Sequence, residues 1–220
     1  MTTVQVSRIG GPITVLGPGT RVVLWVQGCT VGCIGCASTD TWAAEGGFAW
    51  GIRDLADELL DTAARIGATG ITVSGGEPFQ QADALAELLA IMRAEWPNGE
   101  PDVLIFSGYA GRAAKRRSAT LWSAADIIVA GPYRANRRSA HPLLGSDNQT
   151  IEILTTLGAE RIEEITGVAR PLQVGMQDGN LVVVGMPDPD DLDRLRFALV
   201  ARGVSLDDVS WSTAGGGVEA

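Results

Sequence analysis

Apolar residues up to Ala130 occur either as short continuous runs or at helical spacing. Two segments, Ile52–Ile66 and Asp83–Trp96, carry apolar residues three and four positions apart, which predicts amphipathic helices. The continuous runs are typical of strands buried on both faces of a sheet; they are Val22–Gln27, Ile71–Ser74, Val103–Phe106 and Ile127–Ala130. This alternation predicts an α/β fold built from right-handed βαβ units, either a partial (β/α) barrel or a curled parallel sheet.

The pattern changes after about Thr155. Two β-prone runs, Leu172–Gly175 and Leu181–Gly185, flank a turn-rich centre, which predicts a β-hairpin. The segment Asp188–Arg202 has helical spacing with acidic residues in its first turns. We therefore expect a main domain over residues 1–154, a small C-terminal α+β appendage over 155–213 and a disordered tail over 214–220.

Each of the four predicted strands is followed by a segment rich in glycine and polar residues. These segments are Gly28–Cys36, Gly75–Pro78, Ser107–Tyr109 and Gly131–Tyr133. Ligand sites in parallel α/β sheets lie at the carboxyl ends of the strands. The order of the elements therefore predicts that the four segments meet on one rim.

Composition narrows the classes of function. With 45% apolar and 20% charged residues, the chain resembles an ordinary globular protein. Its beginning has no apolar signal region, and no apolar run approaches the roughly 20 residues of a membrane helix, so we expect a cytoplasmic protein. The net charge of −9 argues against broad nucleic-acid binding, which needs a basic surface.

The three cysteines lie within eight residues, an odd and crowded set that suits metal ligation better than disulfides. Cys29, Cys33 and Cys36 follow the spacing C-x3-C-x2-C in a loop with three glycines. Three thiolates would leave one iron of a 4Fe-4S cluster without a protein ligand, and an open metal position is a reaction site. A structural zinc site would need a fourth ligand, and the single histidine, His141, follows a different strand.

The cysteine loop together with Gly75-Gly76-Glu77-Pro78 resembles the radical S-adenosylmethionine superfamily. Within it, the chain is most similar to the activating proteins of anaerobic ribonucleotide reductase, which are glycyl-radical enzyme activases. The residues that carry the resemblance are Gly17-Pro18-Gly19-Thr20-Arg21, Val26-Gln27-Gly28-Cys29, Gly35-Cys36, Thr41-Trp42, Ser74–Pro78, Ser107-Gly108-Tyr109, Gly131-Pro132-Tyr133 and Gly145-Ser146-Asp147-Asn148-Gln149. They follow in order from about residue 10 to residue 153, and the resemblance implies that residues 1–154 form a radical S-adenosylmethionine core domain.

The resemblance implies the cofactors and the chemistry. Cys29, Cys33 and Cys36 would hold a 4Fe-4S cluster, and the amino and carboxylate groups of S-adenosylmethionine would chelate its open iron. Reductive cleavage of the sulfonium bond would then give a 5′-deoxyadenosyl radical that removes a hydrogen atom from the substrate. The protein would contribute placement and exclusion of competing hydrogen donors.

The resemblance also implies residues that contact S-adenosylmethionine. Gly75 and Gly76 would let the backbone approach the methionine end, with the Glu77 carboxylate near its ammonium group. A strand-to-helix turn with a solvated glutamate is the alternative reading of this motif. Gly35 and Ala37, which flank the ligand Cys36, would contribute backbone contacts.

Ser107 and Tyr109 end a predicted strand on the same rim. Their hydroxyl groups could hold the ribose or line the pocket for hydrogen transfer, which makes Ser107 a cofactor-binding and Tyr109 a catalytic candidate. Tyr109 could equally be a half-buried aromatic residue of the core.

Three functions remain open at this point. The chain could place a glycyl radical on a partner enzyme, mature a ribosomal peptide or small metabolite, or serve as an iron-sulfur electron-transfer module without catalysis.

Two basic runs in an acidic protein predict a docking patch for a flavodoxin or ferredoxin donor or for the substrate protein, although solvated loops would look the same. These residues are Arg112, Lys115, Arg116, Arg117, Arg134, Arg137 and Arg138.

Overall fold

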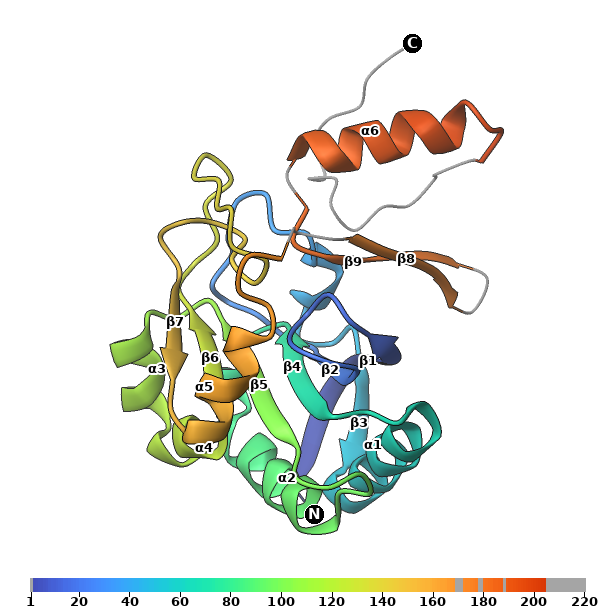
Figure 1. Cartoon of the computed structure of the whole chain (residues 1–220). Helices are drawn as coiled ribbons and strands as arrows, with labels where there is room; N and C mark the ends of the chain where they lie inside the picture. Colours follow the sequence, from blue (N-terminus) through green and yellow to red (C-terminus); the bar gives the residue numbers. More distant parts are fainter. Residues whose placement is uncertain (1, 169–171, 178–179, 188, 205–220) are drawn as a thin grey trace.

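A mixed seven-stranded sheet forms the centre of the protein in the computed structural model, which describes residues 2–168, 172–177, 180–187 and 189–204 (Figure 1). Its strands are β1 (Thr3–Ile13), β2 (Arg21–Val26), β3 (Phe48–Gly51), β4 (Gly70–Gly75), β5 (Asp102–Ser107), β6 (Ile127–Ala130) and β7 (Thr150–Ile153). The order is β3-β1-β2-β4-β5-β6-β7, and the outermost strands do not pair with each other, so the sheet is open. The central strands β2, β4, β5 and β6 are parallel, and β1, β3 and β7 are antiparallel additions.

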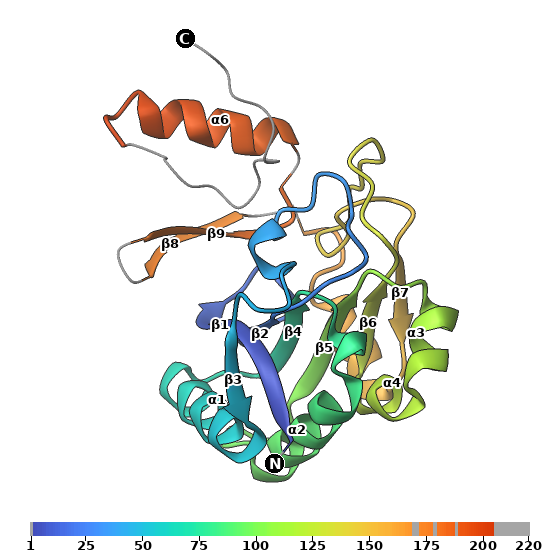
Figure 2. The same cartoon turned by 180° about the vertical axis from the view of Figure 1, so that it is seen from behind.

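Helices cover both faces of this sheet. They are α1 (Ile52–Ile66), α2 (Ala82–Glu95), α3 (Gly111–Arg117), α4 (Ala119–Ala124) and α5 (Thr156–Glu163). Leu24 of β2 belongs to the core that the strands share with α1, α2 and α4, whereas Trp25, one position later, faces the other side. Ile162 of α5 packs on that second side, against Leu104 and Ile127. In Figures 1 and 2, α1 lies towards β3 and α3 towards β7.

The βαβ prediction is confirmed. The strands begin and end within one residue of the predicted runs, and α1 spans the predicted residues. Gly67 ends α1 in the left-handed conformation with a φ of 61°, which costs a glycine little.

The C-terminal hairpin and helix are also present. Strands β8 (Leu172–Gln177) and β9 (Asn180–Gly185) pair antiparallel, and α6 (Pro189–Val200) follows. The Gln173 side chain accepts from the Thr14 N–H at 3.1 Å and donates to the Pro12 carbonyl at 2.7 Å, which attaches the hairpin to β1. Figures 1 and 2 both show the hairpin and α6 projecting beyond the main sheet.

The domain boundary between residues 154 and 155 stays a prediction. The predicted disordered tail over 214–220 and the first residue of the predicted last helix, Asp188, lie outside the described residues. Within the described ranges, every helix is too short or too polar to cross a membrane.

Candidate active site

The four loops that follow the parallel strands meet on one edge of the sheet. The Glu77 N–H, after β4, donates to the Gly28 carbonyl, after β2, at 2.8 Å. The Gly131 N–H, after β6, donates to the Ser107 carbonyl, at the end of β5, at 3.0 Å. The backbone itself therefore joins neighbouring loops in pairs along this rim.

The cysteine loop contains three free thiols that are partly exposed. Its first cysteine is fixed by the Cys29 N–H, which donates to the Trp42 carbonyl at 3.0 Å. Its last turn is closed by the Cys36 N–H on the Cys33 carbonyl at 3.1 Å, and the Ser38 N–H donates to the Cys36 sulfur at 3.4 Å. The loop therefore has an ordered beginning and an ordered end.

Burial raises the pKa of the Cys29 and Cys33 thiols, and backbone N–H groups only partly offset this effect. For Cys29 these N–H groups belong to Val31 and Gly32, and for Cys33 to Tyr133. Negative charge on Glu77 and on the neighbouring cysteines raises both pKa values further. Metal binding at these thiols therefore has to displace protons.

The donor set fits an iron-sulfur cluster better than a single ion. Within the described ranges, no three side chains of Cys, His, Asp or Glu are grouped so that they could hold one metal ion. In a cubane each thiolate binds a different iron atom, so the sulfur atoms do not have to converge on one point. Three thiols on one partly exposed loop are compatible with that requirement and would leave the fourth iron open.

Glycines allow the loops of the rim to approach one another closely. A Cβ atom on Gly76 would lie 2.3 Å from the Gly28 carbonyl oxygen, so no larger residue fits there without a backbone shift. Gly75 has a φ of 93°, and Gly35 has a φ of 79° with Ala135 beside it. The predicted contact residue Ala37 is exposed next to this loop.

Glu77 lies at the centre of the rim, with only 1% of its surface exposed. Its carboxylate accepts three hydrogen bonds, from the Phe79 N–H at 3.0 Å, the Ser107 hydroxyl at 2.9 Å and the Gly108 N–H at 2.7 Å. Burial raises the pKa of Glu77, while these hydrogen bonds and the charge of Arg117 act in the opposite direction. A buried carboxylate with three donors is not the solvated glutamate of the alternative reading.

Tyr109 is a partly buried aromatic residue at the edge of the core, and its role in catalysis stays a prediction. Its ring packs against the main core, and the Arg117 guanidinium lies 4.1 Å from the ring centre. Its hydroxyl oxygen accepts from the Gln80 amide at 2.8 Å, and the same amide donates to the Thr30 hydroxyl at 2.5 Å. Sequence reasoning missed Gln80 and Thr30, and it placed Arg117 only in a basic patch. The position of Gln80, two residues after Pro78 of the Gly-Gly-Glu-Pro turn, was the available signal.

The basic residues differ in their surroundings. Arg137 pairs with Asp147 at 2.5 Å, and Arg138 pairs with Asp190 of α6 at 2.7 Å. Arg117 lies over the Tyr109 ring. The exposed basic residues of α3 are Arg112, Lys115, Arg116 and Arg117, and Lys115 lies over the Trp122 ring.

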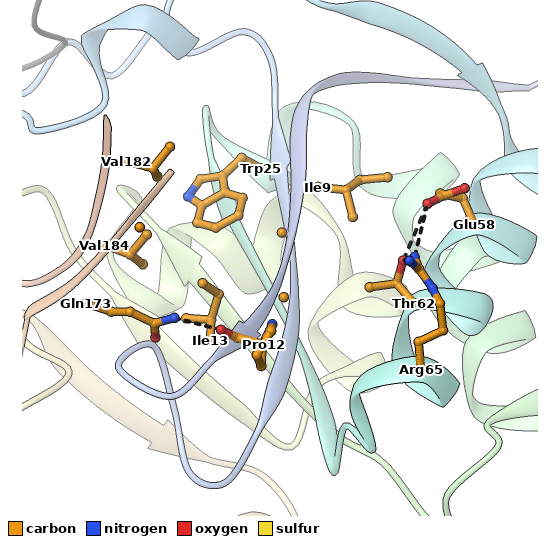
Figure 3. Close-up of a pocket in the computed structure, with 13 residues that line it drawn as sticks. Ile9, Pro12, Ile13, Trp25, Glu58, Thr62, Arg65, Gln173, Val182 and Val184 are labelled. Atoms are coloured by element: carbon orange, nitrogen blue, oxygen red, sulfur yellow. Dashed lines mark hydrogen bonds and ion pairs between the residues drawn. The ribbon is translucent and has the colours of Figure 1, made fainter. Parts of the chain in front are cut away.

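A cavity of about 410 Å³ lies outside the rim, around the middle of β1 (Figure 3). Trp25 and the hairpin residues Gln173, Val182 and Val184 line one side of it. On the other side of β1, Figure 3 shows the polar residues Glu58, Thr62 and Arg65 of α1. None of the residues that line this cavity is a cysteine, so the candidate active site is the rim.

Comparison with known proteins gives consistent similarities. Residues 15–152 match the family described as a 4Fe-4S single cluster domain. The anaerobic ribonucleoside-triphosphate reductase-activating protein of Enterobacteria phage T4 is 32% identical over 137 residues, which cover 61% of this chain and 85% of that protein. The protein of the same name from Vibrio cholerae is 32% identical over 152 residues, which cover 66% of this chain and 95% of that protein.

A second group of relatives is similar over a shorter stretch. The pyruvate formate-lyase-activating enzyme of Listeria monocytogenes is 39% identical over 83 residues, which cover 37% of this chain and 34% of that enzyme. Among solved structures, QueE from Escherichia coli has a TM-score of 0.40 and 14% identity, with 94% of this chain and 93% of that chain covered.

Proposed function

Because the chain belongs to the 4Fe-4S single cluster domain family and to the radical S-adenosylmethionine activating enzymes, we propose that Cys29, Cys33 and Cys36 hold its cluster. The enzyme uses a 4Fe-4S cluster and S-adenosylmethionine. When bound, the cluster supplies the electron that cleaves the sulfonium bond and releases a 5′-deoxyadenosyl radical. We further propose that this radical activates a glycyl-radical enzyme, as the names of the relatives suggest.

The observation that carries the proposal is the position of the cysteine loop against the Gly-Gly-Glu-Pro turn. The Glu77 N–H bonds to the Gly28 carbonyl, one residue before the first cysteine, so the thiols and the glycine turn share one edge. Because Gly76 has no side chain, its backbone can lie directly against the Gly28 carbonyl, where a Cβ atom would lie 2.3 Å from the oxygen. A ligand bound to an open iron would therefore lie beside Gly75, Gly76 and the backbone of Gly35 to Ala37.

Glu77 and its partners prepare this edge for binding. Its carboxylate accepts hydrogen bonds from the Gly108 N–H and the Ser107 hydroxyl. These bonds fix the turn after β4 relative to the turn after β5. We expect this order to reduce the cost of arranging the site when S-adenosylmethionine binds. The negative charge of the carboxylate would favour the ammonium group of the ligand, and the Tyr109 ring would line the reaction space.

The activase role is tested by transfer of the radical to a protein. The reconstituted enzyme is incubated under reducing conditions with S-adenosylmethionine and an anaerobic ribonucleotide reductase from the same source. Electron paramagnetic resonance should detect a glycine-centred radical, and alanine in place of that glycine in the reductase should abolish the signal. Formation of 5′-deoxyadenosine without a glycyl radical, but with modification of a short peptide, would support a peptide maturase and reject the activase role.

We also propose that an acidic electron carrier such as a flavodoxin or ferredoxin docks on α3, and we expect no nucleic-acid partner. The support is charge: the protein has a net charge of −9, yet α3 exposes Arg112, Lys115 and Arg116 close to the turn that contains Tyr109. Complementary charges speed the association of two such proteins, and added salt screens their attraction. Arg137 and Arg138 are paired with acidic residues and are less suited to this role.

Charge reversal tests the docking surface. Changing Arg112, Lys115 and Arg116 together to glutamate should slow cleavage of S-adenosylmethionine driven by the carrier protein, most strongly at low salt. Cleavage driven by dithionite, a small reductant, should stay unchanged and serves as the control. Equal rates with the carrier before and after reversal, across a salt series, would rule out docking on α3.

A further inference from the structure

We propose that Gln80 is a positioning residue that clamps the cysteine loop to the turn after β5. Its side-chain amide donates to the Thr30 hydroxyl at 2.5 Å and to the Tyr109 hydroxyl at 2.8 Å. An amide NH2 group has two hydrogen atoms, so one side chain satisfies both bonds at once. Because Thr30 follows Cys29 directly, the clamp acts on the position of the first thiol.

The clamp is built on a rigid base. Gln80 ends a short 3-10 helix (Pro78–Gln80), and its N–H donates to the Glu77 carbonyl at 3.0 Å. Phe79, the preceding residue, is 3% exposed and packs in the main core. The backbone of Gln80 therefore has little freedom, and the direction of its side chain follows from the buried Glu77 turn.

The second partner of the clamp is also held from other sides. The Tyr109 N–H donates to the Ser107 hydroxyl oxygen at 3.1 Å, and the Arg117 guanidinium covers the ring at 4.1 Å. These contacts restrain Tyr109, so Gln80 links the exposed Thr30 to a side chain that is already held in place. Thr30, which is exposed, is the partner whose position depends on the clamp.

The middle of the cysteine loop has little packing of its own. A Cβ atom on Gly32 would meet nothing within 4 Å, and Ile34 is 84% exposed. The side-chain bond to Thr30 therefore adds a restraint to a stretch with few other contacts, among them Val31 beside Gly108 and Cys33 beside Tyr133. The consequence is that Gln80 adds a side-chain restraint between Thr30 and the Tyr109 turn, in addition to the backbone bond from Cys29 to Trp42, before any cofactor binds.

The first test measures the loop in cluster-free protein. Iodoacetamide alkylates the cysteines at fixed pH under anaerobic conditions, and mass spectrometry gives the rate of Cys29 relative to Cys36 in each variant. Gln80→Leu, which keeps the size and removes both bonds, should raise this ratio about 2- to 10-fold, the range that one neutral hydrogen bond spans. Thr120→Val, the matched change at an exposed threonine of α4, should leave the ratio unchanged.

Two further variants distinguish the clamp from general destabilisation. Thr30→Val should raise the ratio as much as Gln80→Leu does, and the double variant should show no further rise, because both changes break the same bond. Gln80→Glu should restore the wild-type ratio once each rate is divided by the thiolate fraction of that cysteine, because its carboxylate accepts from both hydroxyl groups but also raises the pKa of nearby thiols. An unchanged ratio in Gln80→Leu, additive effects in the double variant, or no rescue by glutamate would overturn the proposal.

The second test uses the reconstituted enzyme and rests on the proposed function. Gln80→Leu should keep the wild-type iron content but need about 2- to 10-fold more S-adenosylmethionine for half of the change in the electron paramagnetic resonance spectrum of the reduced cluster. A loss of iron in proportion to the loss of signal would mean a merely structural role and would overturn the proposal. The alkylation result does not depend on a cluster, so failure of the cluster assignment is recognised separately.

Discussion

Replacing Glu77 by glutamine tests whether the buried carboxylate organises the rim. One carboxylate oxygen accepts from Phe79 and Ser107, and the other accepts from the Gly108 N–H at 2.7 Å. In Glu77→Gln, the amide oxygen can keep the first two bonds, but the NH2 group then faces the Gly108 N–H. Two donors opposed in a buried site cannot bond, so Gly108 loses its partner.

The magnitude follows from the bond that is lost. A hydrogen bond to a charged group contributes about 1.5–3 kcal/mol, and removal of a costly buried charge offsets part of this, so we expect destabilisation of about 1–3 kcal/mol. Urea unfolding of the cluster-free protein measures it, with Glu87→Gln on the exposed face of α2 as the matched control. The control should stay within about 0.5 kcal/mol of the wild type. Equal urea midpoints for the two variants would refute the reasoning.

The pH dependence of the same variant gives a second check. Burial raises the pKa of Glu77 above its ordinary value of 4.5, so between the unfolded and the folded pKa the folded protein binds more protons at this side chain than the unfolded chain does. This contribution to stability is present at low pH and is lost as the pH rises through the folded pKa. The unfolding free energy of the wild type relative to Glu77→Gln should therefore increase as the pH falls through the raised pKa of Glu77 towards its ordinary value of 4.5. A difference that increases with pH instead would contradict this sign.

Two further substitutions test the packing of the rim and of the opposite edge of the sheet. Gly76→Ala should cost about 1–3 kcal/mol in urea unfolding, because its Cβ would lie 2.3 Å from the Gly28 carbonyl oxygen, whereas Gly175→Ala, with open space around it, should change stability by less than about 0.5 kcal/mol. Equal effects would show that the close approach is not needed. Asp102→Ala should cost about 3–5 kcal/mol, because it leaves the fully buried Arg21 guanidinium without the carboxylate 2.8 Å away. A loss below about 1 kcal/mol in the same assay would contradict the importance of this ion pair.

The central strands were predictable because burial on both faces leaves an unbroken apolar run. Val103–Phe106 and Ile127–Ala130 have this form, and the structure places strands at both positions. The edge strands were not predictable in the same way. β1 contains Gly10-Gly11-Pro12, which is typical of a turn, and β3 has four residues, of which Phe48 is 71% exposed. Such strands are defined by their neighbours in the sheet, which a local pattern does not contain.

In the candidate site, too, the position of the loops was predictable from the sequence, whereas the side-chain bonds between them were not. The order of the elements predicts that the cysteine loop and the Glu77 turn share a rim, since the carboxyl ends of parallel strands meet at one edge. The side-chain bonds across that rim depend on three-dimensional contacts that spacing does not encode. Gln80 is 50 residues from Thr30 and 29 from Tyr109 along the chain, and only the fold brings the three together.

The most direct test of the account is the amount of 5′-deoxyadenosine formed by the anaerobically reconstituted protein with S-adenosylmethionine and dithionite. The wild-type protein, loaded with about four irons per chain as one cubane requires, should form it. Alanine at Cys29, Cys33 or Cys36 should abolish both its formation and the absorbance of the cluster. Full formation of 5′-deoxyadenosine by any one of these three variants would contradict the assignment of the cluster to this loop.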